Sequence, residues 1–325
     1  MDRRVAAELA AQEGADEDLV DSLFRLVLRR EPEPEARERA LAKLAEGTLS
    51  RATLIHELVA SDEFRRVREL DDAVALGLAA RARRERIRWL QAPPGTDERV
   101  VEIPWVLSRL RTTGRVLEVG YAFAEPAYVA GLLRADVEVV GVDLAARDVG
   151  PMESVRADVR ALPFPDRSFD QVLLVSTLEH VGADNTVYGL EAENEDGARL
   201  AALRELARVL ERDGSLLVTV PLGEPADYGW FRQEDERGWT SLFARAGLFV
   251  EELEAYELGA EGWRAAPSFA PEGVRYGERG PAASAVLCGD LSPGRLRHLL
   301  TPGGLRKATR RRAARTYRRA RPHDL

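Results

Sequence analysis

Residues 115–125 read Arg-Val-Leu-Glu-Val-Gly-Tyr-Ala-Phe-Ala-Glu, and the apolar run within them ends at Gly120. A second apolar run ends further along the chain at Asp143. In an open parallel sheet, the tight turn after the first strand lets backbone approach a ligand, and an acid at the tip of the second strand accepts from ribose hydroxyls. We therefore expect a nucleoside site at the carboxyl ends of two parallel strands.

The turn after Gly120 differs from a dinucleotide-binding turn. Ala122 and Ala124 stand where a glycine-rich turn has its later glycines. A pyrophosphate requires a close approach of the backbone. The turn therefore disfavours NAD and favours a nucleoside ligand that has no phosphate.

Apolar runs alternate with helical stretches through the middle of the chain. We expect strands near residues 115–119, 137–142, 153–157, 169–175 and 215–220, and helices near residues 98–110, 125–134, 198–211 and 235–246. Two later apolar runs, at 248–256 and 283–290, would complete the sheet, and residues 259–281 between them are expected to form a long loop. The alternation predicts an α/β fold with a doubly wound, mostly parallel sheet.

Five segments together resemble a class I S-adenosylmethionine-dependent methyltransferase. They are residues 116–120, Asp143, residues 158–164, residues 169–182 and residues 206–221. The resemblance covers roughly residues 97–291 and implies a Rossmann-like fold with one late antiparallel strand. It also implies that S-adenosyl-L-methionine is the cofactor and that the chain is an enzyme. The first motif keeps Glu118 and Gly120 but has alanines in place of two further glycines.

Five residues are candidates for holding the cofactor away from its methyl group. Gly120 would let the backbone approach the methionine part. Asp143 is expected to bind the ribose, with a helix N-cap as the alternative. The resemblance implies that Asp158 accepts from the adenine amino group, whereas a turn residue is the alternative. Leu144 and Val159 would sandwich the adenine ring or serve as ordinary packing.

The methyl end of the cofactor is expected near residues 176–180, which read Ser-Thr-Leu-Glu-His. Ser176 is therefore a candidate cofactor residue, and Glu118 would organise the ammonium of the cofactor or hydrogen-bond to the following loop. A hydroxyl acceptor must lose a proton, and His180, with an ordinary pKa of about 6.5, could take it. The alternative is that His180 only shapes the pocket. Glu179 could orient His180, although adjacent side chains on a helix point apart.

Three aromatic residues are candidates for the acceptor pocket, namely Trp105, Tyr228 and Trp230. Aromatic faces suit a carbohydrate or another partly apolar molecule, and core packing is the alternative for Trp105. The arrangement also resembles methyltransferases encoded with bacterial polysaccharide genes, which implies a hydroxyl of a glycan or sugar precursor as the acceptor. Two alternatives stay open: a small-molecule O- or N-methyltransferase of secondary metabolism, and a non-catalytic cofactor-binding scaffold in a glycan-assembly complex.

Residues 1–92 are expected to form a small all-α domain, separated from the domain at 97–291 by the proline-rich stretch 91–96. Residues 28–32, 47–50 and 61–64 resemble a small helical domain of unknown function that is found on bacterial surface proteins and fused to glycan-assembly enzymes. The resemblance implies a module that docks on such enzymes. A helical cap on the catalytic domain is the alternative.

The composition is that of a soluble protein in a reducing, cytoplasmic compartment, since Cys288 is the only cysteine and no signal-peptide or membrane-spanning run is seen. Residues 292–325 are strongly basic within a chain of net charge −8. This tail is expected to be solvated, to contact an anionic membrane surface at the inner face, or to dock on an acidic protein surface. The acidic body disfavours specific nucleic-acid binding. The acidic run at 191–196 is expected to be a solvated helix entry, so we expect no metal site.

Overall fold

The computed structural model describes residues 14–280 and 282–294. They form two compact units that divide between Asp72 and Ala73, inside the helix α5 (Asp62–Ala82). The sequence placed residues 73–92 in the N-terminal module, whereas the structure groups them with the second unit. Residues 83–92, expected as part of an all-α domain, are not helical. Arg84 has a φ of 56°, which ends the helical geometry, and Ala92 pairs with Trp263 by backbone hydrogen bonds.

The first unit is helical. It contains α2 (Asp16–Leu23), the π-helical turn η1 (Phe24–Leu28), α3 (Pro34–Ala45), α4 (Arg51–Ala60) and the first part of α5. The hydroxyl of Ser50 caps α4, because its Oγ accepts from the amide of Thr53 at 3.0 Å. Leu19, Leu23 and Val27 lie in the core of this unit, but Leu26 is exposed because the π-turn changes the helical phase.

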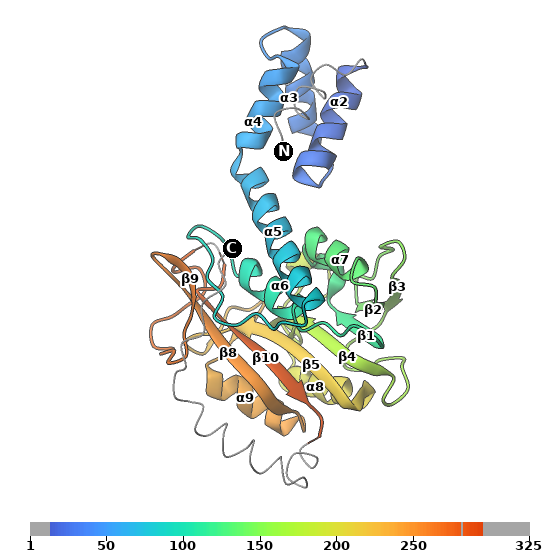
Figure 1. Cartoon of the computed structure of the whole chain (residues 1–325), viewed down its shortest axis with the longest axis vertical. Helices are drawn as coiled ribbons and strands as arrows, with labels where there is room; N and C mark the ends of the chain where they lie inside the picture. Colours follow the sequence, from blue (N-terminus) through green and yellow to red (C-terminus); the bar gives the residue numbers. More distant parts are fainter. Residues whose placement is uncertain (1–13, 281, 295–325) are drawn as a thin grey trace. The chain divides into compact units, whose positions relative to one another are not determined.

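The second unit is built on an eight-stranded sheet of order β3-β2-β1-β4-β5-β10-β8-β9 (Figure 1). The five strands β1 to β5 are parallel, and β10 is antiparallel to β5. Because β8 is antiparallel to β10, it runs in the same direction as β1 to β5, whereas β9 is antiparallel to β8. The strands are β1 (Arg115–Val119), β2 (Glu138–Asp143), β3 (Glu153–Arg156), β4 (Phe169–Val175), β5 (Leu210–Pro221), β8 (Phe249–Gly259), β9 (Gly262–Ala265) and β10 (Ala285–Ser292), with a separate hairpin of β6 (Ala226–Asp227) and β7 (Arg232–Gln233).

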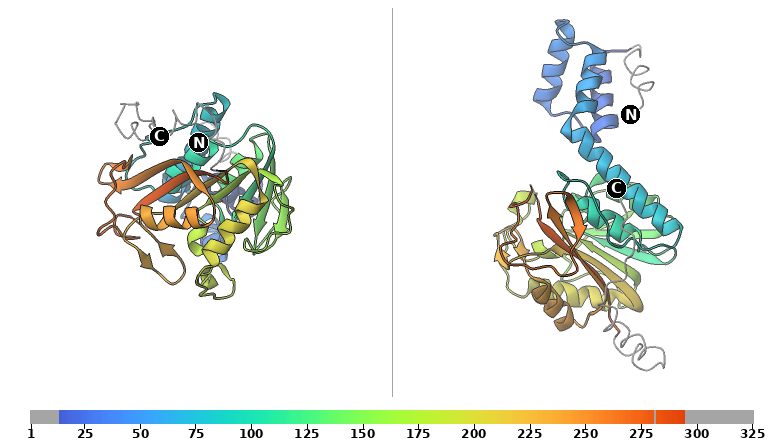
Figure 2. Two further views of the ribbon diagram at one scale, coloured as in Figure 1. Left: turned by 90° about the horizontal axis from the view of Figure 1, so that it is seen from below. Right: turned by 60° about the vertical axis from the view of Figure 1, so that its left-hand side comes forward.

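Helices cover both faces of this sheet, which confirms the doubly wound α/β fold (Figures 1 and 2). The helices α6 (Arg99–Leu107) and α7 (Pro126–Leu133) lie on one face, and α8 (Ala198–Val209) and α9 (Glu236–Arg245) lie on the other. The strand β9 lies inside the stretch 259–281 that was expected to be a loop. It forms because Trp263 pairs with Ala92 on one side and β9 pairs with β8 on the other.

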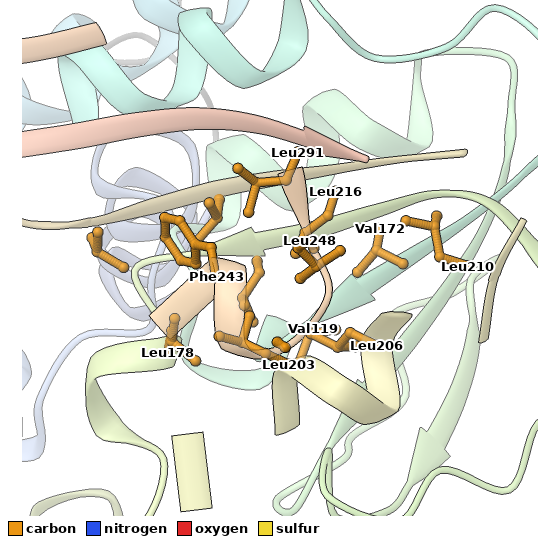
Figure 3. Close-up of a cluster of buried hydrophobic side chains, with 14 of the residues drawn as sticks. Val119, Val172, Leu178, Leu203, Leu206, Leu210, Leu216, Phe243, Leu248 and Leu291 are labelled. Atoms are coloured by element: carbon orange, nitrogen blue, oxygen red, sulfur yellow. The ribbon is translucent and has the colours of Figure 1, made fainter. Parts of the chain in front are cut away.

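The main core lies between the sheet and the helices α8 and α9 (Figure 3). Leu203 and Leu206 from α8 and Phe243 from α9 pack against apolar strand residues such as Val119 and Val172. Cys288 is also fully buried, on β10, and burial raises the pKa of its thiol well above the ordinary range. Within residues 14–280 and 282–294, none of the helices combines the length and the apolar character needed to cross a bilayer.

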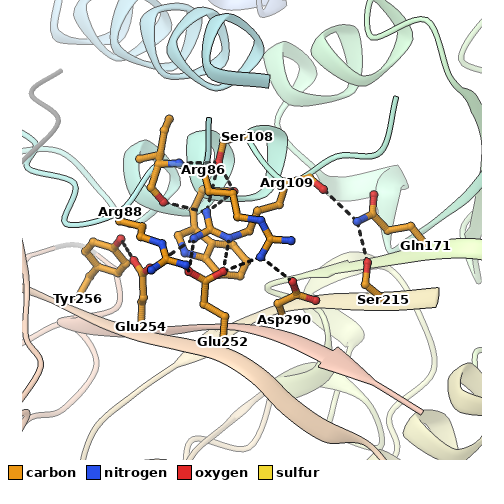
Figure 4. A network of polar contacts seen from close by, with 12 residues as sticks. Arg86, Arg88, Ser108, Arg109, Gln171, Ser215, Glu252, Glu254, Tyr256 and Asp290 are labelled. Carbon is orange, nitrogen blue, oxygen red and sulfur yellow. Dashed lines mark hydrogen bonds and ion pairs between the residues drawn. The ribbon is translucent and has the colours of Figure 1, made fainter. Parts of the chain in front are cut away.

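A buried ionic network ties the segment after α5 to the antiparallel end of the sheet (Figure 4). The side chain of Arg109 is 0% exposed and donates to Glu252 at 3.0 Å and to Glu254 at 3.3 Å. The same guanidinium donates to the carbonyls of Ile87 and Trp105. Burial raises the pKa of Glu252, but Arg109 and two further arginines outweigh burial and lower that pKa to about 2.

Replacing the central arginine of this network should destabilise the fold. Arg109→Ala would leave the carboxylates of Glu252 and Glu254 buried without their main partner, so we expect a loss of about 3–5 kcal/mol in the free energy of unfolding, measured with urea. The matched control is Arg264→Ala, which removes a surface pair with Glu257 and should cost less than about 1 kcal/mol.

The effect should depend on pH with a definite sign. The pKa of Glu252 falls from an ordinary 4.5 to about 2 in the folded chain. The stabilisation is therefore present above pH 4.5 and is lost as the pH falls through about 2. Over that pH range, the free energies of unfolding of wild type and Arg109→Ala should become more similar. Equal urea midpoints for the two proteins at pH 7 would contradict the role of the network.

Candidate functional site

A cavity of about 160 Å³ lies at the carboxyl ends of the parallel strands. It is lined by residues that end or follow β1, β2, β3 and β4, by one side of α6 and by the loop after β4. It brings together seven residues that the sequence singled out, namely Gly120, Asp143, Leu144, Asp158, Val159, Ser176 and His180. Four others, Glu118, Trp105, Tyr228 and Trp230, do not line it.

The floor of the cavity is the turn at Gly120. Its φ is 89°, and a Cβ atom at this position would lie 2.4 Å from Oγ1 of Thr177. The amide of Gly120 donates to the carbonyl of Val142 at 2.9 Å, which joins the ends of β1 and β2. Both the left-handed backbone and the close approach of Thr177 therefore require glycine here.

The carboxylate of Asp143 is held in place by backbone amides. Its Oδ2 accepts from the amide of Ala122 at 3.0 Å, and its Oδ1 accepts from the amide of Ala145 at 2.8 Å. Each oxygen keeps a second lone pair, which leaves it able to accept from a hydroxyl in the cavity. Leu144 follows directly and is 43% exposed, so it presents an apolar surface beside this carboxylate.

The carboxylate of Asp158 is shared with Arg160. The guanidinium donates to Asp158 from Nε and Nη2 at 2.6–3.0 Å, and it also contacts Glu193 at 2.9 Å and Glu195. Burial raises the pKa of Asp158, but the hydrogen bonds from Arg160 outweigh burial and lower it. The acidic run at 191–196 is therefore engaged by arginine, with Asp196 paired to Arg232.

Glu118 differs from its expected place, since its side chain is buried behind the cavity wall. Its Oε2 accepts from the hydroxyl of Tyr128 at 2.8 Å, and Tyr128 lines the cavity instead. Burial raises the pKa of the Glu118 carboxyl well above its ordinary range, against the opposing effect of the Tyr128 hydroxyl. The side chain of Tyr128 therefore lies between Glu118 and the cavity.

Ser176 belongs to a polar chain that the sequence did not reveal. Its φ is 43°, and its Oγ donates to Oε1 of Glu102 at 2.8 Å. The other oxygen of Glu102 accepts from Nη1 of Arg99 at 2.6 Å. Glu102 is fully buried, whereas Arg99 lines the cavity. The sequence did contain one signal for this polar chain, because Glu102 is a charged residue inside the otherwise apolar run 100–107 of α6.

His180 has a fixed tautomer. Its Nδ1 lies 2.9 Å from the carbonyl of Trp230, so Nδ1 carries the proton and Nε2 has the free lone pair. Within the described part of the chain, no hydrogen bond engages Nε2. Burial chiefly lowers the pKa of His180 to about 4, so the ring is neutral at physiological pH. Trp230, and not Glu179, orients the ring.

Glu179 points into the protein. Its Oε2 is buried and has no hydrogen-bond partner among residues 14–280 and 282–294. Burial, with Glu102 nearby, raises the pKa of its carboxyl to about 8, so the group is protonated at neutral pH.

The three aromatic candidates have different environments. Trp105 is 0% exposed and lies against the guanidinium of Arg109, 3.9 Å from the ring centroid, so it is core packing and not pocket wall. Trp230 is part of an aromatic cluster beside the cavity, with its ring centroid 5.2 Å from that of His180. Tyr228 lies one layer further out, stacked on Phe231 at 4.6 Å. The sequence missed Tyr188, which lines the cavity and contacts His180.

These residues fit S-adenosylmethionine. The backbone at Gly120 has no side chain and would admit the methionine part, Asp143 would accept from the ribose, and Leu144 and Val159 would flank the adenine. When bound, this cofactor supplies a methyl group that is already activated by the sulfonium charge.

Removing the carboxylate at the end of β2 should abolish cofactor binding. Asp143→Ala deletes the acceptors for two ribose hydroxyls, and charged hydrogen bonds contribute about 1.5–3 kcal/mol each, so we expect at least a hundredfold loss of affinity. Calorimetric titration of S-adenosylhomocysteine measures the change. The control is Asp148→Ala, an acid on the exposed turn after the same strand. Retained affinity in Asp143→Ala would rule out the ribose role.

Comparisons with known proteins identify the two parts of the chain. Residues 117–218 match the family model described as "Methyltransferase domain". Residues 5–67 match the model described as "Domain of unknown function (DUF4214)". No curated protein gives a significant match.

Solved structures that are similar to this chain are distant from it. A Burkholderia thailandensis 1,6-didemethyltoxoflavin-N1-methyltransferase with bound S-adenosylhomocysteine is 15% identical, over 87% of this chain and 92% of that chain, with a TM-score of 0.39. A SAM-dependent methyltransferase from Methanosarcina mazei is 14% identical, over 58% of this chain and 96% of that chain, with a TM-score of 0.38.

The methyltransferase match falls on the strands whose carboxyl ends line the cavity. The enzyme therefore carries a class I S-adenosylmethionine-dependent methyltransferase domain, and S-adenosylmethionine is its cofactor.

Proposed function

We propose that the enzyme transfers a methyl group from S-adenosylmethionine to a hydroxyl of a bacterial glycan or of its sugar precursor. The observation that carries this proposal is the neutral ring of His180. Its Nδ1–H is committed to the carbonyl of Trp230, its Nε2 lone pair is free, and aromatic rings flank it at the cavity.

A hydroxyl acceptor needs a group that receives its proton during transfer. A histidine that is neutral at physiological pH and holds its ring by Nδ1 can receive that proton at Nε2. The low pKa makes His180 a weaker base than a solvated histidine, so positioning must supply much of the acceleration. The roles proposed for Gly120, Asp143 and Asp158 in holding the cofactor serve this positioning.

The aromatic surroundings support a carbohydrate acceptor. Tyr188 and Trp230 contact the His180 ring, with centroids 5.4 and 5.2 Å away, and Phe231 lies at 6.0 Å. Of these rings, that of Tyr188 lines the cavity, and a ring face suits the apolar face of a sugar, while hydroxyls meet the few polar groups of the wall. We further propose that the N-terminal module docks on glycan-assembly enzymes. Most of the basic tail at 292–325 lies outside the described residues.

The acceptor class can be tested directly. The purified enzyme is incubated with methyl-labelled S-adenosylmethionine and with polysaccharide, sugar-nucleotide and small-metabolite fractions of a cell extract. We expect label in one of the two carbohydrate fractions, in an alkali-stable ether linkage. Label only in the small-metabolite fraction would overturn the carbohydrate acceptor, and binding without transfer to any fraction would indicate a non-catalytic scaffold.

Removing the proposed base should reduce turnover and spare the cofactor. We expect His180→Ala to lower kcat by about 10²–10⁴-fold and to leave the affinity for S-adenosylhomocysteine unchanged. His56→Ala, at an exposed position of the first unit, is the control. Unchanged turnover in His180→Ala would rule out the base.

The pH profile provides a separate test of the same residue. The active form of His180 is the neutral ring, and its pKa is about 4. Activity should therefore stay level as the pH falls from 8 to 6 and should decline only as the pH approaches about 4. An inflection at the ordinary histidine pKa of about 6.5 would contradict this environment.

A further inference from the structure

We propose that Arg160 is a positioning residue that joins the adenine end of the cofactor site to the loop that walls the acceptor side. Through it, cofactor binding at Asp158 would order the acceptor pocket, so that each ligand raises the affinity for the other. This role rests on the proposed function, because the adenine contact of Asp158 and the acceptor wall are both part of it.

Arg160 faces three carboxylates that come from two separate segments. On one side it makes three side-chain hydrogen bonds to Asp158, which begins the turn after β3. On the other side its Nη2 donates to Glu193 at 2.9 Å and its Nη1 donates to Glu195. The side chain is only 20% exposed and lines the cavity, so these contacts are partly shielded from water.

The second segment is the loop at residues 183–196, which we call the acceptor loop. Glycines with φ of 76° and 93°, Gly182 and Gly197, flank it. The amide of Glu195 donates to the carbonyl of Gly182 at 3.0 Å, so the ends of the loop lie close together. Such compact loops move as units about their ends.

The acceptor loop supplies one side of the cavity wall. Asn185, Tyr188 and Leu190 all line the cavity. The ring of Tyr188 contacts the ring of Phe123, which lies in the turn after β1, with 4.9 Å between the ring centroids. It also contacts the ring of His180, with 5.4 Å between the centroids. A shift of this loop would therefore change both the mouth of the cavity and the surroundings of the proposed base.

Asp158 takes part both in the proposed binding of adenine and, through Arg160, in holding the acceptor loop. The adenine amino group would donate to the same carboxylate that holds Arg160, and Arg160 holds the acceptor loop. Bound adenine fixes Asp158, which fixes Arg160, and the acceptor loop loses its freedom to open. Two ligands that order the same element bind with positive coupling.

The test compares hydrogen exchange of the acceptor loop with and without S-adenosylhomocysteine in the full chain. We expect the ligand to slow exchange at residues 183–196 in wild type. In Arg160→Ala this slowing should disappear, and the affinity for S-adenosylhomocysteine should fall about tenfold, because Asp158 is no longer held in place for the adenine. Arg160→Lys, which keeps the charge without the planar fork, should restore part of the slowing.

Arg232→Ala is the matched control. Arg232 also anchors the acceptor loop, through Asp196 and Asn194, but among the described residues its side-chain contacts do not include Asp158. We expect faster exchange of the loop in this variant, with the slowing by S-adenosylhomocysteine retained. If Arg160 has a purely structural role, S-adenosylhomocysteine should slow exchange of the loop equally in both variants. That result would overturn the proposal.

Two results separate failure of this proposal from failure of the cofactor site. If wild type binds S-adenosylhomocysteine but exchange at residues 183–196 does not change, the coupling through Arg160 is wrong and the cofactor site stands. If wild type does not bind this ligand at all, both the site and the coupling are overturned.

Discussion

The contact between the backbone of Gly120 and the side chain of Thr177 sets the geometry on which the site depends. It fixes how closely the turn after β1 approaches the turn after β4, because there is no room for a Cβ atom between them. The amide of Gly120 also joins the end of β2, and the amide of Ala122 then meets Asp143. Three strand ends are thus held in one arrangement by a residue that has no side chain.

The helix α6 links this site to the rest of the second unit. Its Glu102 accepts from Ser176 and Arg99 at the cavity, and Arg109, just after the helix, anchors the buried network on β8. Buried charges of this kind contribute little net stability but penalise any arrangement that leaves one of them unpaired. The same helix therefore specifies both the position of the cavity wall and the packing of the antiparallel strands.

The ends of β1, β2 and β4 could be predicted because each is marked by an apolar run that stops at a polar residue or a glycine. Gly120, Asp143 and Ser176 share one cavity for this reason. Asp158 follows the polar strand β3 and was indicated by the family resemblance. Arg160 and Tyr188 could not be predicted, since Arg160 reaches Glu193 and Tyr188 lies on the irregular acceptor loop. Arg99 could not be predicted because its partner Glu102, three residues away, meets Ser176 only in the folded chain. Trp105 was placed in the pocket because aromatic residues suit both environments. Every residue from 100 to 107 is buried, so helical periodicity gave no way to assign its face.

Cys288 has a practical consequence for following motion in this enzyme. It is the only thiol in the sequence, it is fully buried on β10, and its raised pKa keeps it protonated. Maleimide and iodoacetamide reagents react with exposed thiolates. A single cysteine introduced on the surface would therefore be the preferred target for a fluorophore or spin label, without first replacing a native residue.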